Sequence, residues 1–148
     1  MKKLILKFNT LASKLSDIPL LAIRLVLAYG FYVPAKNKWE DIGAIGDWFE
    51  TLGLPAPHAQ AYLVAGTEAI GVVLLILGLG TRFIALPLIV TMLVAIKTVH
   101  WGNGFNASDN GYEIPLYYII MLLSLFVFGG GKIGLDFLIK KRLKIKPE

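Results

Sequence analysis

The sequence contains no cysteine. Disulfides, CxxC redox motifs, iron–sulfur ligation and thiolate zinc sites are therefore excluded. Histidine is scarce as well, because His58 and His100 are the only two. A bis-histidine haem would need these two side chains to face each other. A labile copper contact at His58 or His100 is the other metal chemistry that the residue types allow.

Charged residues are also few, at 17% of the chain, against 56% hydrophobic residues and a mean hydropathy of +0.67. The net charge of +5 could indicate a nucleic-acid partner. However, the basic residues gather at the two ends of the chain and flank apolar runs, which is the pattern of membrane proteins. We therefore expect a lipid bilayer as the partner and no nucleic acid.

Four apolar runs predict membrane helices at about residues 18–34, 60–79, 83–100 and 113–130. Roughly 20 residues cross ~30 Å of hydrocarbon, so the shorter runs must extend into their flanks. The expected fold is all-α, an integral membrane four-helix bundle in one domain covering 1–148. The connections 34–60 and 100–113 contain only Lys36 and Lys38 as basic residues. By the distribution of Lys and Arg, both termini should be cytoplasmic, in a bacterial inner membrane.

Two amphipathic helices are predicted outside these spans. At the N-terminus, apolar residues recur at spacings of four, three and four, which indicates a helix lying in the interface; they are Leu4, Phe8, Leu11 and Leu15. In the first outer connection, a second apolar stripe predicts a short interfacial helix, or alternatively a re-entrant lid; it contains Trp39, Ile42, Ile45, Phe49 and Leu52.

Ionisable residues inside the spans are costly and usually face a partner in the bundle interior. Arg24, Glu68 and Lys97 are the clear cases, and Glu113 opens the last span. Glu68 follows Ala61 and Ala65 on one helical face, a small-residue pattern that lets helices approach closely. We therefore expect Glu68 to point at a neighbouring helix.

The polar stretch at residues 98–115 separates the last two spans. Its flanks predict two groups of neighbours: Lys97 with His100 and Trp101 on one face, and Glu113 with Tyr117 on another. Together with Glu68, and with His58 nearby, these side chains form a plausible outward-facing polar cluster. The alternative is that ion pairs such as Glu68–Lys97 or Lys97–Glu113 only set the helix register. A quinone, a metal or a peptide are the ligands considered for such a cluster.

Several segments resemble the DoxX-like membrane proteins, in the family's order: "IRLVLAYGFYVPAKNKW", "DWFETLGLPAP", "GTEAIGVVLLILGLGTR" and "GGKIGLDF". The positions that match are Arg24, Gly30, Lys36 or Lys38, Trp48, Phe49, Gly53, Leu54, Pro55, Glu68, Gly78, Thr81, Arg82 and Asp136. The family's Lys usually comes sooner after the Gly, so two candidates remain for that position.

The segment "MLVAIKTVHWGNGFNASDNGYEIPLYY" resembles a subset encoded beside copper-binding modified peptides of the bufferin type. The resemblance implies an accessory subunit that matures such a peptide or supports redox homeostasis. Other DoxX-like proteins resemble the membrane subunit of thiosulfate:quinone oxidoreductase, so a quinone-reactive subunit is the alternative, and a small exporter, which would need a homo-oligomer, is a third. The residues contain no self-contained catalytic constellation.

Overall fold

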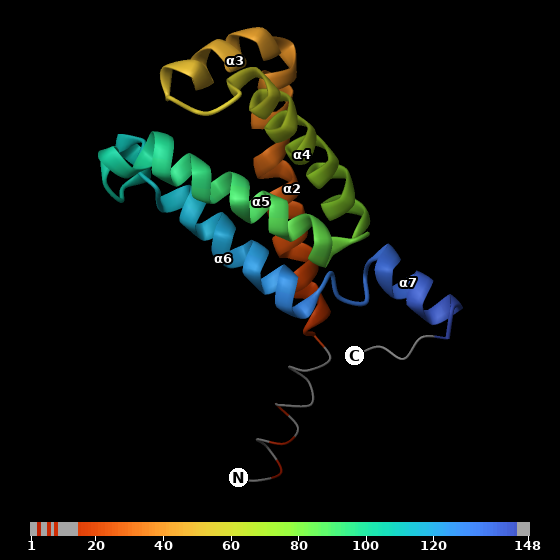
Figure 1. The fold of residues 1–148 in the computed structure, drawn as a ribbon. Coiled ribbons are helices and arrows are strands. Elements are labelled where there is room, and N and C mark those ends of the chain that lie inside the picture. Colours follow the sequence, from red (N-terminus) through yellow and green to blue (C-terminus); the bar gives the residue numbers. More distant parts are fainter. Residues whose placement is uncertain (1–2, 4–5, 7, 9–14, 145–148) are drawn as a thin grey trace.

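The computed structural model describes residues 3, 6, 8 and 15–144, and this part of the chain is helical and contains no strand (Figure 1). The α-helices are α2 (Asp17–Glu40), α3 (Ile42–Thr51), α4 (Pro57–Leu77), α5 (Thr81–Ala95), α6 (Glu113–Phe128) and α7 (Leu135–Arg142). After α5 the chain continues as a π-helical turn, Ile96–His100, and then as the short 3₁₀ turns Trp101–Asn103 and Ala107–Asp109. The predicted N-terminal amphipathic helix lies mostly outside the described residues.

Among the residues that the structure describes, three helical stretches are long and apolar enough to cross a membrane: Asp17–Glu40, Pro57–Leu77 and Thr81–Asn103. Helix α6 is a shorter apolar helix. Large apolar side chains cover the outer faces of these helices, including Tyr29, Leu63, Ile70, Phe83, Val90, Val127 and Phe128. Such surfaces would be unfavourable in water and are what lipid-facing helices present.

The core is formed by one face of each of four helices. Its buried members are Leu27, Ala28 and Phe31 from α2, Leu75 from α4, Ile84, Ala85 and Leu88 from α5, and Leu122 and Leu125 from α6. Helix α2 packs mainly on α4, and α5 packs mainly on α6. The fully buried Ala61 and Ala65 allow the close approach on α4 that the small-residue pattern predicted.

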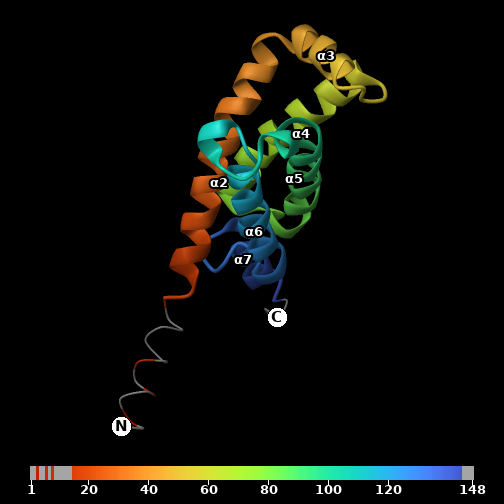
Figure 2. The ribbon, with the colours of Figure 1, turned by 90° about the vertical axis from the view of Figure 1, so that its left-hand side faces the viewer.

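Helix α3 lies at one end of the structure, and the turn between α4 and α5 lies at the opposite end together with α7 (Figures 1 and 2). Helix α3 forms where the second amphipathic stripe predicted a helix, and in it Phe49 is buried and Asp47 is exposed. Trp39, however, belongs to the last turn of α2, where its indole N–H donates to the Ala65 carbonyl at 3.2 Å.

The end that carries α7 is held together around the fully buried Arg24. Its guanidinium donates to the carbonyl of Ile133 and interacts electrostatically with Asp136. The Asp136 carboxylate accepts hydrogen bonds from the backbone N–H groups of Gly80 and Thr81, at 2.8 and 3.2 Å, and so caps the start of α5.

Gly78, one of the positions that resemble DoxX-like proteins, lies at a backbone turn where only glycine fits. It ends α4 in the left-handed conformation, at φ +63°, and a Cβ there would collide with the Arg24 guanidinium. Its carbonyl accepts the backbone N–H of Asp136 at 3.0 Å. Arg24, Gly78 and Asp136 therefore join three segments of the chain at one end of the bundle, and their arrangement is structural.

Candidate functional site: a cavity with a buried ion pair

Helix α2 continues past Pro34 for almost two turns, to Glu40, instead of ending near residue 34 as the apolar run suggested. Its buried face follows one helical stripe from Arg24 through Phe31 and Ala35. Lys38 stands three residues after Ala35, so it continues this stripe toward α4. Because α2 is longer than predicted, Lys38 belongs to this helix and its ammonium group faces α4 inside the bundle, not the outer connection.

Lys38 and Glu68 form a buried ion pair between α2 and α4. The Lys38 Nζ lies 3.0 Å from Oε1 and 2.8 Å from Oε2 of Glu68. Only 16% of the Lys38 side chain and 3% of the Glu68 side chain are exposed. Because a lysine ammonium has three N–H groups and the carboxylate occupies two directions, one donor remains for another acceptor.

The partner of Glu68 differs from the one considered on sequence grounds, which was Lys97. Lys97 is exposed, whereas Lys38 occupies the position facing Glu68. Of the two candidates for the family's lysine, Lys38 is the one largely shielded from solvent. Lys36 is exposed and lies 3.5 Å from Glu40, one turn further along the same helix.

A cavity of about 890 Å³ opens beside this ion pair, with walls from α2, α3, α4, α5, the π-helical turn and α6. Its size is that of cavities that hold small organic ligands. Most of its lining is apolar, with aromatic rings from Phe31, Trp48, Phe49 and Tyr118. The polar members are Lys38, Gln60, Thr67, Glu68, Thr91, Thr98, His100, Asn110 and Tyr118.

Gly30 leaves room for one of these rings. A Cβ at Gly30 would collide with the hydroxyl of Tyr118, so the tyrosine lies directly against the α2 backbone. Tyr118 also makes an edge-to-face contact with Phe31, with ring centroids 5.4 Å apart. Gly30 therefore sets the position of an aromatic wall of the cavity.

Within the segment 98–115, His100 and Glu113 bond to backbone groups of the loop between the π-helical turn and α6. The His100 Nδ1 lies 2.8 Å from the Asn110 carbonyl. Glu113 accepts the backbone N–H of Ala107 at 3.0 Å and the hydroxyl of Tyr117 at 3.0 Å. The pairing of Glu113 with Tyr117 is thus present, but both groups are engaged in the loop and not with Glu68.

The π-helical turn changes the local spacing on which the grouping of Lys97, His100 and Trp101 was predicted. The Trp101 backbone N–H bonds the Ile96 carbonyl, five residues back, so the α-helical spacing of neighbours is lost there. His100 lines the cavity, whereas Lys97 is exposed. Trp101 is 68% exposed and stacks on Tyr112, with ring centroids 5.5 Å apart.

The two histidines have different surroundings. His58 stands in the first turn of α4, and its Nε2 lies 3.5 Å from a carboxylate oxygen of Asp47 on α3. His100, in contrast, bonds to the loop that follows α5. The two candidate metal contacts therefore have different partners, and within the described part of the chain a group of potential metal ligands with two carboxylates, Asp47 and Glu50, surrounds His58.

Comparison with known proteins identifies the family. The DoxX domain matches residues 19–101, from the start of α2 to the end of the π-helical turn. The chain belongs to the DoxX family. The matched region contains Arg24 and both members of the Lys38–Glu68 pair, and with the three apolar helices it establishes a membrane protein.

Three relatives match more than three quarters of the chain. An "Uncharacterized protein" of Haemophilus influenzae is 37% identical over 130 residues, which are 85% of this chain and 86% of that protein. The "Putative oxidoreductase CatD" of Bacillus subtilis is 32% identical over 131 residues, covering 82% of this chain and 96% of the relative. A second Haemophilus influenzae protein is 34% identical over 126 residues, covering 77% and 85%. No solved structure matches the chain significantly.

Proposed function

We propose that this DoxX protein is the membrane-embedded accessory subunit of a redox system and that its cavity binds a quinone-class ligand. The observation that carries the proposal is the buried Lys38–Glu68 pair in the wall of a largely apolar cavity. A buried ion pair contributes little to stability compared with apolar packing, so its presence at a cavity favours a role in binding.

The chemistry of the cavity fits an aromatic ring with polar oxygens and an apolar tail. The third N–H of Lys38 would donate to a carbonyl oxygen of the ring. Glu68 would accept a hydrogen bond from a hydroxyl of the reduced ligand. Aromatic walls from Trp48, Phe49 and Tyr118 suit a flat ring, and the rest of the lining suits an isoprenoid tail.

An accessory role follows from the composition of the chain. The chain has no cysteine to hold an iron–sulfur cluster, and its two histidines have different partners, so they do not form a bis-histidine pair for a haem. A partner protein would therefore supply the electrons. The name of the Bacillus subtilis relative, an oxidoreductase, supports redox chemistry as the setting.

The cavity faces the outside of the cell in this proposal. Arg82, Lys132, Lys140, Lys141 and Arg142 lie at or beside the α4–α5 turn and α7. The opposite end has fewer basic residues, Lys36, Lys38 and Lys97, and it also has the acidic residues Asp41, Asp47, Glu50 and Asp109. By the positive-inside rule, the α7 end is cytoplasmic in the inner membrane of a bacterium, and both termini with it.

The resemblance of residues 92–118 implies a role in maturing a copper-binding peptide. The contacts made by this segment do not add support for that role. His100 and Glu113 are bonded to the backbone of their own loop. We therefore propose an accessory role, as the resemblance implies, but with a quinone-class molecule and not a peptide as the ligand.

The proposal is tested by titrating the purified protein with a short-chain ubiquinone analogue in mild detergent, with tryptophan quenching as the readout. Wild type and Lys36→Met should bind alike, since Lys36 is exposed outside the cavity. The double variant Lys38→Met with Glu68→Gln, which removes both charges together, should bind at least about tenfold more weakly, a loss of roughly 1.4 kcal/mol. Equal binding by the double variant and the wild type would refute it.

A further inference from the structure

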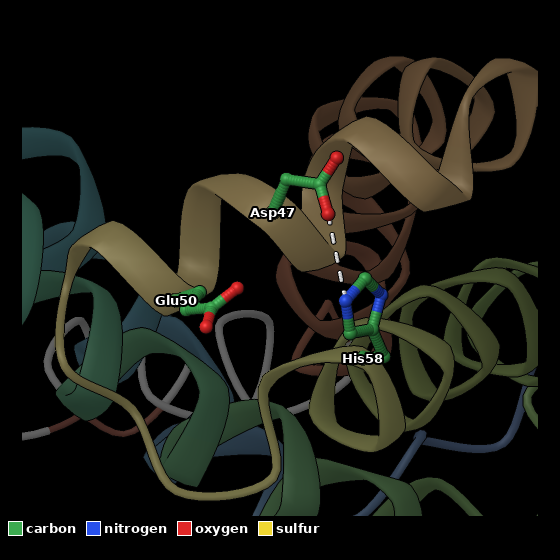
Figure 3. A group of neighbouring side chains, drawn as sticks. All are labelled: Asp47, Glu50 and His58. Carbon is green, nitrogen blue, oxygen red and sulfur yellow. Dashed lines mark ion pairs between the residues drawn. The ribbon is translucent and has the colours of Figure 1, made fainter.

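Asp47, Glu50 and His58 form a group of potential metal ligands at the α3 end of the molecule (Figure 3). One ligand atom of each residue lies within 4.8 Å of the others. Asp47 and Glu50 are three residues apart on α3 and therefore project from the same face of that helix. His58 reaches them from the first turn of α4.

We propose that these three residues bind a divalent transition-metal ion, with one imidazole nitrogen and two carboxylate oxygens as ligands. Zn²⁺ accepts this donor set, at about 2.0–2.2 Å from nitrogen and oxygen. Around a tetrahedral ion with such bond lengths, ligand atoms lie about 3.3 Å apart. The Nε2 of His58 and Oδ1 of Asp47 are already 3.5 Å apart, and the ligand atom of Glu50 lies within 4.8 Å of both, so rotation of these exposed side chains would bring the three around one ion.

The position of the imidazole ring is set by the backbone of α3. Gly46 is buried beneath the ring, and a Cβ at this residue would collide with the His58 Nδ1. The ring therefore lies against α3 on its Nδ1 side, and its Nε2 is turned to the carboxylate of Asp47 (Figure 3). An imidazole whose Nδ1 side packs against the backbone and whose Nε2 faces a carboxylate suits metal binding through Nε2.

Metal binding here would fasten α3 to α4. Trp48 and Phe49, which follow Asp47 directly, line the cavity described above. The chain between the helices includes Gly53 at φ +71° and Ala56 at φ +48°. The ion would therefore hold the α3 wall of the cavity in place. The metal site itself stands on its own ligands and does not depend on what the cavity binds.

The test is an isothermal titration of untagged, full-length protein in detergent with Zn²⁺. The wild-type protein should bind one ion per chain. His100→Ala should bind it equally well, because His100 is not one of the three ligands and has its own partner, the Asn110 carbonyl. His58→Ala and the double variant Asp47→Asn with Glu50→Gln should bind at least about tenfold more weakly, since even the loss of outer partners weakens metal binding 10–100-fold.

A melting experiment separates loss of the site from loss of the fold. Without metal, His58→Ala and the double variant Asp47→Asn with Glu50→Gln should melt near the wild type, because the side chains of Asp47, Glu50 and His58 are exposed. Added Zn²⁺ should raise the melting temperature of the wild type and of His100→Ala, but not of His58→Ala. Absence of stoichiometric binding by the wild type, or undiminished binding by His58→Ala, would overturn the assignment.

Discussion

Lys38 and Glu68 face each other across α2 and α4, with the lysine Nζ 2.8 and 3.0 Å from the two carboxylate oxygens. Two residues earlier on the same helix, Lys36 points outward and pairs with Glu40 in an exposed position. The two lysines thus provide a matched comparison, because they share a helix and a chemistry but differ in burial.

The first prediction uses this comparison to measure stability. Lys38→Met should lower the free energy of unfolding by about 3–5 kcal/mol, because it leaves Glu68 buried without its counter-charge. Lys36→Met should change it by no more than about 0.5 kcal/mol. The double variant Lys38→Met with Glu68→Gln should recover most of the loss. Unfolding by denaturant in detergent measures all three, and a loss of similar size for both single lysine variants would contradict the burial difference.

The second prediction concerns the cap of α5. Asp136→Ala removes the acceptor for the N–H groups of Gly80 and Thr81 and takes a counter-charge from the buried Arg24. We expect a loss of roughly 2 kcal/mol or more, at or above the upper end for a lost N-cap. Asp47→Ala, at an exposed carboxylate, is the control and should melt like the wild type in metal-free buffer. Equal melting of both variants would show that the cap is unimportant.

The third prediction concerns the wall of the cavity at Gly30. Gly30→Ala should displace Tyr118 and cost about 1–3 kcal/mol through overpacking. Gly66 lies in α4 with open space around a new Cβ, so Gly66→Ala should be neutral or stabilise by up to about 1 kcal/mol. Thermal unfolding of the two alanine variants checks the contrast. Destabilisation by Gly66→Ala alone would contradict the packing described here.

The fourth prediction concerns orientation in the membrane. Because the chain has no cysteine, a single introduced thiol reports one position. Thr51→Cys, at the end of α3, should react with a membrane-impermeant maleimide in intact spheroplasts. Lys140→Cys, on α7, should react only after lysis. The reverse pattern would place the cavity and the Asp47–Glu50–His58 group on the cytoplasmic side.

Much of the fold could be predicted from the sequence, because apolar runs and small-residue faces act locally. The burial of Glu68 followed from its spacing to Ala61 and Ala65. Its partner was missed because Pro34 and the polar residues after it suggested that the helix ended there. The stripe of Phe31, Ala35 and Lys38, at spacings of four and three, was the signal that could have revealed the buried lysine.

The loop at residues 98–115 could not be predicted in the same way. The prediction that Lys97 and His100 are neighbours assumed a regular α-helix. The residue pattern did not predict the π-helical turn that replaces it. The partners of His100 and Glu113 are backbone groups of the loop, at Asn110 and Ala107. Such contacts depend on the conformation of the loop, so side-chain types alone could not predict that His100 and Glu113 bond to backbone groups.

The central claim is that the cavity beside Lys38 and Glu68 holds a quinone-class ligand, and an inventory of bound quinone tests it most directly. Wild type, Lys36→Met and the double variant Lys38→Met with Glu68→Gln would be purified in parallel from the same membranes, and extracted quinone would be quantified per chain. We predict near-stoichiometric quinone in the first two proteins and only the micelle background in the double variant. The same background level of quinone in all three would contradict the account.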